Sequence, residues 1–167
     1  SLRPAIAIPM FFGYAFGPAV GFFTGAVGNM FGDALTGFGL SPQWSVGNGL
    51  VGMIAGMAIL FKDKKRSLNT VFIISALVAA IGTVIFLLNK TIPNMLFYDV
   101  DNNIFGDQQI SWFAGLSAII GLVLVVLVRF LFRDNIHVAA AVTWSMLGNF
   151  LGIGFAAISD IWINGFS

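Results

Sequence analysis

The sequence predicts an all-α protein, a polytopic transmembrane helix bundle. Three observations predict it: 58% of the 167 residues are hydrophobic, only 9% are charged, and the mean hydropathy is +0.94. A soluble domain carries about a quarter charged residues and does not cover its exterior with this much apolar surface. Because a backbone surrounded by lipid must satisfy its own hydrogen bonds, long apolar runs favour helices as the spanning element. The length fits one integral-membrane domain, residues 1–167.

Six apolar segments are predicted to be the helices of this bundle. A helix crosses the hydrocarbon core with about 20 apolar residues. The N-terminal run is longer than one crossing needs and breaks at Gly17-Pro18, because proline disfavours helix at the residue before it. A single kinked helix is the alternative there. Ser41 and Pro42 suit the N-cap and first turn of the third helix. The predicted helices cover Ala5–Phe16, Pro18–Leu35, Val46–Phe61, Leu68–Leu88, Ile110–Phe132 and Ile136–Phe155.

The basic residues predict the orientation of the bundle. Lys62–Arg66 forms one short basic loop, and Arg129–Arg133 flanks another turn. The positive-inside rule puts both in the cytoplasm. Two spans separate the clusters, so the two assignments agree. The segments Lys90–Gln109 and Gly37–Trp44 are then external.

Several classes of chemistry are excluded by composition. The chain has no cysteine, which removes disulfides, thiolate zinc sites and cysteine nucleophiles. Its acids are seven Asp and no Glu, and a single histidine, His137, rules out a polyhistidine metal site within one chain. No Walker A, GxSxG or HExxH motif is present. The net charge of +1 does not favour a nucleic-acid surface. We therefore expect no catalytic residues, no cofactor, no metal and no nucleic-acid partner.

Glycines recur at helical spacing in three of the segments. Small residues three or four apart let helix backbones approach closely in lipid. Packing within the bundle is the expected role, and docking to a partner membrane protein is the alternative. The three sets are Gly17, Gly21, Gly25, Gly28 and Gly32; Gly52 and Gly56; and Gly148, Gly152 and Ala156.

Polar residues inside apolar helices are costly, so each is expected to have a partner or a function. Asn29 and Asp33 lie four apart on one helix face, and Asn48 lies near the start of the next helix, below Gln43 and Trp44. We expect these five to converge beneath the external loops. Amides beside an aromatic side chain suit a small polar ligand with a flat ring. The alternative is a polar clamp between two helices, with Trp44 as an interfacial anchor.

Two further tryptophans are candidates. Trp112, at the outer start of its span, is either a ligand contact or a member of the interfacial aromatic belt. Trp144 lies deeper, beside Ser145 and five residues before Asn149, where packing alone is the alternative. His137, near the inner end of its helix, is expected to have an interfacial role.

The N-terminal third resembles a known family. The segments Leu2–Pro9, Phe16–Phe22, Gly28–Asp33 and Trp44–Gly52 are similar to the S-component family of energy-coupling-factor vitamin transporters. In that family a short helix leads through an F-G-P-x-x-G turn into a Gly-rich helix, an outer loop and a further helix. The similarity covers about residues 2–60, and the later helices agree in hydropathy and order.

The resemblance implies a specific function. S-components are prokaryotic plasma-membrane proteins, usually of six helices, that bind a vitamin on the outer side. They associate with a transmembrane T-component and two cytoplasmic ATPases. The candidates here are riboflavin-, cobalamin- and pyridoxine- or pyrimidine-like vitamins. Residues at the substrate-holding positions are Asn29, Asp33, Gln43, Trp44, Asn48 and, more loosely, Trp112.

Two departures from the family pattern accompany the resemblance. The family's first helix has no counterpart, so we expect an upstream helix to be missing, and the helix from Ile136 is additional. A different class of function stays open: an accessory subunit of a larger membrane assembly, with no ligand of its own.

Overall fold

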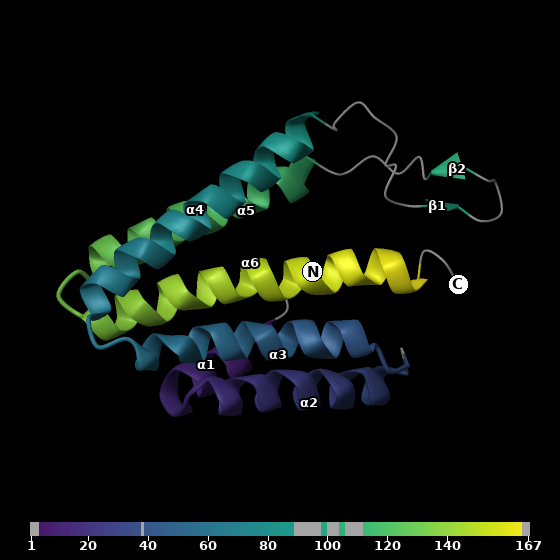
Figure 1. The fold of residues 1–167 in the computed structure, drawn as a ribbon, viewed down its shortest axis with the longest axis horizontal. Helices are drawn as coiled ribbons and strands as arrows, with labels where there is room; N and C mark the ends of the chain where they lie inside the picture. Colours follow the sequence, from purple (N-terminus) through teal and green to yellow (C-terminus); the bar gives the residue numbers. More distant parts are fainter. Residues whose placement is uncertain (1–3, 38, 89–97, 100–103, 106–111, 165–167) are drawn as a thin grey trace.

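The structure is a bundle of α-helices, as predicted (Figure 1). The computed structural model describes residues 4–37, 39–88, 98–99, 104–105 and 112–164. Two-residue strands β1 (Tyr98–Asp99) and β2 (Ile104–Phe105) pair antiparallel. Two 3₁₀ turns, η1 (Pro4–Ile6) and η2 (Ala58–Leu60), adjoin α1 and α3. The helices are α1 (Ala7–Phe16), α2 (Pro18–Thr36), α3 (Pro42–Met57), α4 (Lys64–Leu88), α5 (Trp112–Leu131) and α6 (Ile136–Asn164).

Three segments are long and apolar enough to cross a membrane, among the described residues: Pro42–Leu60, Lys64–Val84 and Ile136–Ser159. Two of the helices extend further than the hydropathy predicts. α4 starts at Lys64 rather than Leu68, and α6 ends at Asn164 rather than Phe155. Hydropathy marks the part of a helix that suits lipid, whereas the backbone hydrogen bonds continue into polar residues.

The N-terminal run is two helices, not one kinked helix. Gly17 separates them with φ = 105°, a conformation that side-chain-bearing residues rarely adopt. Pro18 then occupies the first turn of α2, where its missing N–H costs nothing. α1 has ten residues and therefore a length of ~15 Å. It is too short to cross a bilayer.

α3 lies at the centre of the bundle, between α2 and α6 (Figure 1). In its span 56% of the residues are buried, against 28% for α4. Its glycines allow the close approach, because a Cβ placed on Gly13 of α1 or Gly21 of α2 would overlap the carbonyl oxygen of Gly52. The predicted packing role is confirmed for Gly21 and Gly52, and Gly13 is an addition to it. Gly28 and Gly32 differ, with no atom within 4 Å of an added Cβ.

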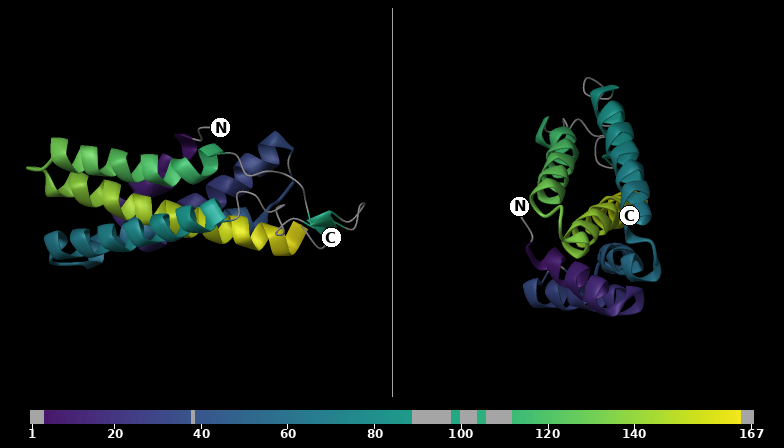
Figure 2. Two further views of the ribbon diagram at one scale, coloured as in Figure 1. Left: turned by 90° about the horizontal axis from the view of Figure 1, so that it is seen from above. Right: turned by 90° about the vertical axis from the view of Figure 1, so that its left-hand side faces the viewer.

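α6 is part of the central layer rather than an appendage. A Cβ on Gly148 would lie 2.6 Å from the carbonyl oxygen of Val51, and one on Gly152 would lie 2.5 Å from that of Gly47. The backbones of α6 and α3 therefore lie in close contact at these glycines. On its other side, α6 carries the hairpin of α4 and α5, which stands away from the α1–α3 layer (Figure 2, right).

The interior and the exterior are both apolar. A buried cluster joins α3, α4 and α6, and Trp144 within it packs against Phe61, with ring centroids 5.2 Å apart. Phe23 and Leu35 of α2 are 67% and 86% exposed. Large apolar side chains on the outside cost free energy in water and none in lipid, so this surface suits a bilayer.

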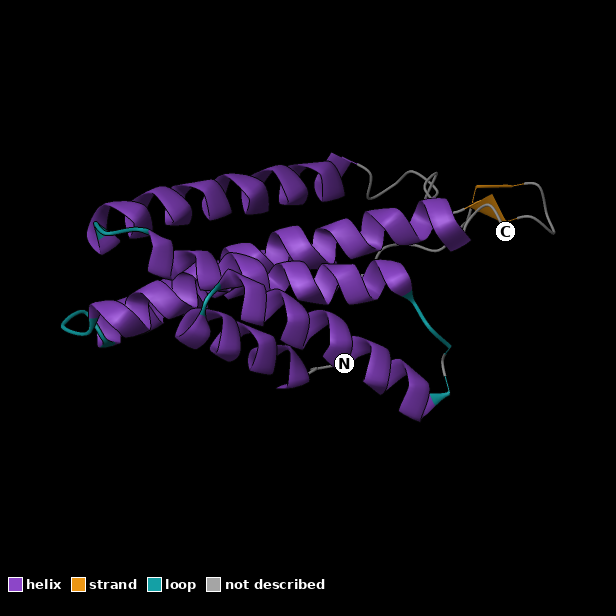
Figure 3. Cartoon of the chain, turned by 60° about the horizontal axis from the view of Figure 1, so that its bottom comes forward, coloured by secondary structure: helices purple, strands orange, loops and turns teal. Residues whose placement is uncertain are grey.

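The two basic clusters lie at the same end of the bundle, opposite the α2–α3 loop (Figure 3). Lys64 Nζ lies 3.0 Å from His137 Nδ1, and Tyr14 Oη lies 3.4 Å from the same atom. Arg129 donates to Asn69 Oδ1 at 3.0 Å and lies 5.1 Å from the ring centroid of Phe72. This basic end is where α1, α4, α5 and α6 are tied together.

Candidate substrate-binding site

A polar network joins α2 to α3 at the end away from the basic clusters. It consists of Asn29, Asp33, Ser45 and Asn48. Asn29 Nδ2 donates to Asp33 Oδ2 at 3.0 Å and to Ser45 Oγ at 3.2 Å. Asn48 Nδ2 donates to Asn29 Oδ1 at 2.9 Å. The predicted convergence of Asn29, Asp33 and Asn48 is therefore present in the structure.

Local sequence explains this arrangement. Asn29 and Asp33 lie four apart, so both face α3 from the same side of α2. On α3, Asn48 and Ser45 share a face at a spacing of three. The helices approach closely here because Gly25 has no side chain, and a Cβ at that position would overlap the carbonyl oxygen of Asn48.

The unused atoms of the network are hydrogen-bond acceptors. Both amide nitrogens donate within the protein, since Asn48 Nδ2 also bonds the carbonyl oxygen of Trp44 at 2.9 Å. Asp33 Oδ2 accepts a second bond from the backbone N–H of Ser41 at 3.3 Å. Asp33 Oδ1 and Asn48 Oδ1 accept no hydrogen bond from the described residues. The network is thus suited to groups that donate hydrogen bonds.

Of the remaining predicted site residues, Gln43 and Trp44 lie beside the network on α3, and Trp112 is on another helix. Gln43 and Trp44 are in the first turn of α3, where Gln43 is buried and Trp44 half-buried. Trp112 begins α5, and its side chain is outside the described residues. Ser41 is the N-cap of α3, as predicted, although its side chain makes no capping bond. Ser45 was not predicted as a site residue. Its spacing of three from Asn48 places both residues on one face of α3 and would have indicated it.

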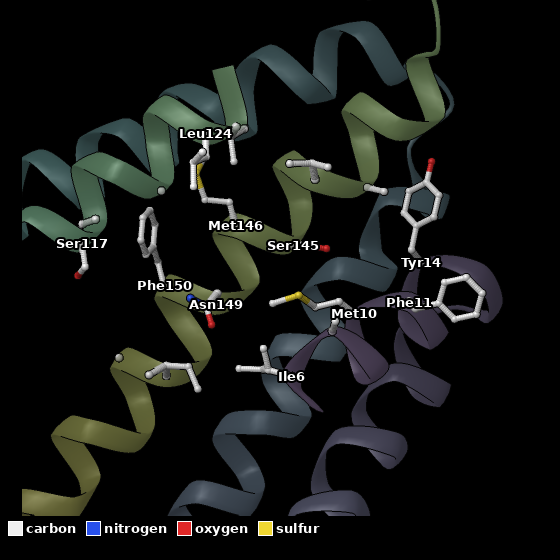
Figure 4. A pocket seen from close by; sticks show the side chains of 18 residues that line it. Ile6, Met10, Phe11, Tyr14, Ser117, Leu124, Ser145, Met146, Asn149 and Phe150 are labelled. Carbon is white, nitrogen blue, oxygen red and sulfur yellow. The ribbon is translucent and has the colours of Figure 1, made fainter. Parts of the chain in front are cut away.

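A second feature was not predicted from the sequence. A cavity of about 870 Å³, here named the lateral cavity, lies between α1, α5 and α6 (Figure 4). Among the residues that the structure describes, none that lines it is charged. Its lining residues are Ile6, Ala7, Met10, Phe11, Tyr14, Ser117, Ala118, Gly121, Leu124, Val125, Ala141, Val142, Ser145, Met146, Asn149, Phe150, Ile153 and Gly154.

Two polar side chains of α6 face the lateral cavity. Ser145 and Asn149 lie one turn apart on the side toward α1, whereas Met146 and Phe150 face α5 (Figure 4). Trp144, next to Ser145 in the chain, belongs instead to the core cluster, so the packing interpretation of this tryptophan is the one the structure supports. In the described part of the chain, no group of three or more His, Cys, Asp or Glu residues could hold a metal ion.

The chain is similar to several UPF0397 proteins. It is 33% identical over 89 residues to a UPF0397 protein of Aliivibrio salmonicida, covering 51% of this chain and 49% of the relative. It is 40% identical over 57 residues to one of Vibrio atlanticus, covering 34% of this chain and 31% of that one. A UPF0397 protein of Streptococcus pneumoniae is 33% identical over 72 residues, covering 43% of this chain and 38% of the relative.

These matches span about half or less of the length of each curated relative. No solved structure matches the chain. The family described as "ECF-type riboflavin transporter, S component" matches residues 1–127, which include α1 to α4 and most of α5. The resemblance that the N-terminal third carries therefore extends over three quarters of the sequence, and the chain belongs to the ECF-type riboflavin transporter S-component family.

Proposed function

We propose that this protein is the substrate-capturing subunit of an ATP-driven importer of a small water-soluble vitamin. Family membership supports a substrate-binding membrane subunit. The single observation that carries the proposal is the polar network, because amides and a carboxylate inside apolar helices are costly unless they have a function. Riboflavin-, cobalamin- and pyridoxine- or pyrimidine-like vitamins all carry hydroxyl or N–H donors, which suit the acceptors Asp33 Oδ1 and Asn48 Oδ1.

The orientation follows from charge. With Lys62–Arg66 and Arg129–Arg133 in the cytoplasm of a prokaryotic cell, the network faces the outside. Gln43 and Trp44 then line the entrance. A vitamin arriving from outside reaches the network first, and Lys90–Gln109 lies on the same side of the membrane.

Partner subunits supply the energy. The chain has no phosphate-binding motif, so it does not hydrolyse ATP by itself. As an S-component it works with a transmembrane T-component and two cytoplasmic ATPases. Its exposed apolar surface meets lipid and the T-component.

A binding titration tests this function. The purified protein in detergent is titrated with riboflavin, cobalamin, pyridoxine and thiamine, and with the variants Asn48→Ala and Trp44→Ala. One vitamin is expected to bind, at least tenfold more weakly to each variant. Asn69→Ala is the matched control, because it removes an asparagine bonded to Arg129 at the basic end. No binding of any vitamin would contradict the proposal.

The second candidate is an accessory subunit that binds no ligand. The donors of Asn29 and Asn48 are all used within the protein, which is what a clamp between helices requires. In that case Asn48→Ala lowers thermal stability, and the wild-type protein binds none of the four vitamins.

A further inference from the structure

The lateral cavity is open to the surroundings of the bundle. Phe11 of α1 and Leu124 of α5 both line it, and both side chains are exposed. In a bilayer such exposed apolar side chains contact hydrocarbon, so the space between them is continuous with the acyl chains of the membrane. Apolar space excludes water. A hydrocarbon chain is therefore the chemically matched occupant of the apolar part of this cavity.

Tyr14 connects the lateral cavity to the basic end of the bundle. It lies at one end of the cavity, and Ser117 lies at the other (Figure 4). The hydroxyl oxygen of Tyr14 is 3.4 Å from His137 Nδ1, and Lys64 Nζ is 3.0 Å from the same atom. One end of a largely apolar cavity is therefore next to a lysine ammonium group.

The contacts at this end leave hydrogen-bond donors for a further partner. A neutral imidazole has one acceptor nitrogen, so His137 Nδ1 does not serve both Lys64 and Tyr14 equally, and the shorter distance belongs to Lys64. An ammonium group has three N–H donors, of which this bond uses one. In the described part of the chain no carboxylate forms an ion pair with Lys64. The remaining N–H groups and the Tyr14 hydroxyl suit the oxygens of a phosphate.

The charges around these donors favour an anion. Residues 62–66 and 129–134 hold six basic and two acidic side chains, which gives this end a net charge of +4. Both acids have local partners: Asp63 accepts a 3.0 Å bond from the backbone N–H of Arg66, and Asp134 pairs with the arginine before it. A basic surface of this kind at the edge of a membrane attracts anionic lipid headgroups.

The part of the cavity nearest to the basic end is apolar. A chain that begins at Tyr14 meets aliphatic side chains of α5 and α6 before it reaches the other polar lining residues, which are Ser117, Ser145 and Asn149. Methionine side chains adapt to the shape of a flexible chain. The apolar lining residues in this part are Met10, Leu124, Val125, Ala141, Val142 and Met146.

We propose that an anionic phospholipid binds here, with its phosphate at Lys64 and Tyr14 and one acyl chain in the lateral cavity. Such a lipid joins α1 to α4 through its headgroup and packs its chain against α5 and α6. The lipid site lies at the opposite end of the bundle from the polar network. It does not depend on the proposed function, because the lipid is a structural ligand and not the transported vitamin.

Three probes of different charge and length test this inference by native mass spectrometry of the protein in a non-ionic detergent. They are dioleoyl-phosphatidylglycerol, dioleoyl-phosphatidylcholine and glycerol phosphate, which has the anionic group without acyl chains. The anionic lipid is expected to bind at least tenfold more tightly than either other probe. Equal binding of the two lipids would overturn the anionic headgroup. Equal binding of glycerol phosphate would show a site for free phosphate and overturn the role of the acyl chain.

Two variants locate the site. Lys64→Gln removes the ammonium group, and Gly121→Phe projects a ring into the cavity from α5. Each is expected to weaken binding of the anionic lipid at least tenfold. Lys65→Gln is the matched control for charge, because Lys65 is an exposed neighbour. Gly82→Phe is the control for size, because Gly82 and Gly121 both have no atom within 4 Å of an added Cβ and only Gly121 lines the cavity.

The variants also separate this site from general attraction between a basic surface and anionic lipids. Equal losses in Lys64→Gln and Lys65→Gln would show general attraction and contradict the proposal. Undiminished binding to Gly121→Phe would show that the chain lies outside the lateral cavity. An unchanged melting temperature shows that a variant is folded. If Gly121→Phe melts earlier, Ala118→Met fills the same wall with a smaller side chain and takes its place.

The outcome for the lipid is independent of the outcome for the vitamin. Loss of lipid binding in Lys64→Gln with unchanged vitamin binding supports both proposals. A protein that binds the anionic lipid and no vitamin contradicts the proposed function alone. A protein that binds a vitamin and shows no preference for the anionic lipid contradicts the lipid site alone.

Discussion

Asn48 Nδ2 donates to Asn29 Oδ1 over 2.9 Å, and this bond joins α3 to α2 between two apolar helices. The same nitrogen also bonds the carbonyl oxygen of Trp44 one turn earlier. Asn29 Nδ2 in turn donates hydrogen bonds to Asp33 and Ser45. The loop between α2 and α3 is held by the same network, because the backbone N–H of Ser41 bonds Asp33.

A double-mutant cycle measures the bond between these two amides. We expect Asn29→Ala and Asn48→Ala to be coupled by about 0.5–1.5 kcal/mol, the range of interhelical hydrogen bonds in membrane proteins. The measurement is the free energy of unfolding in detergent–denaturant mixtures. The pair Asn48→Ala and Asn69→Ala serves as control and is expected to be additive, since the residues lie at opposite ends of the bundle. If the effects of Asn29→Ala and Asn48→Ala on the free energy of unfolding were additive, the two side chains would not form a stabilising hydrogen bond between α2 and α3.

Replacing either of two glycines of α2 by alanine is expected to change the stability of the bundle in opposite directions. A Cβ at Gly25 overlaps the backbone of Asn48, whereas one at Gly28 meets no atom within 4 Å. Gly25→Ala is expected to destabilise the bundle by about 1–3 kcal/mol through overpacking. Gly28→Ala is expected to stabilise it by about 0.5–1 kcal/mol, because alanine is the better helix former. Thermal unfolding of both variants checks the contrast, and equal effects would contradict the α2–α3 packing.

Arg129 and Arg133 are predicted to differ in importance. Arg129 bonds Asn69 and lies over Phe72, so it ties α5 to α4. Within the described residues, Arg133 makes only a 4.0 Å ion pair with Asp134, and the two side chains are 75% and 97% exposed. Arg129→Gln is expected to cost about 1 kcal/mol of stability, and Arg133→Gln close to nothing. Comparable losses in chemical unfolding would show that the α4–α5 hairpin is held in another way.

The absence of native cysteine makes the orientation directly measurable. Single substitutions Lys65→Cys and Leu40→Cys introduce one thiol at each end of the bundle. A membrane-impermeant maleimide applied to intact cells is expected to label Leu40→Cys and not Lys65→Cys. After permeabilisation both are expected to react. Labelling in the reverse pattern would place the polar network on the cytoplasmic side.

Much of the fold is readable from sequence because lipid imposes simple local rules. The break at Gly17-Pro18, the start of α3 near Pro42 and the start of α6 at Ile136 follow from proline, glycine and hydropathy alone. The central position of α6 does not follow from these local features. Its central position depends on contacts between Gly152 and Gly47, which are far apart in the chain.

The same distinction applies to the candidate sites. Asn29, Asp33 and Asn48 lie on consecutive helices joined by a short loop, so their meeting can be predicted from spacing. The lateral cavity cannot be predicted in this way. Asn149 faces an open space because α1 and α5 stand on either side of α6, and tertiary packing alone sets that geometry.

The most direct test of the account is native mass spectrometry of the protein released gently from the membranes of cells grown with riboflavin, cobalamin and pyridoxine. The account predicts a species heavier than the polypeptide by the mass of one vitamin, and its depletion in Asn48→Ala but not in Asn69→Ala. A spectrum that contains only the bare polypeptide, both alone and after addition of each vitamin in excess, would contradict the claim that this chain captures a vitamin.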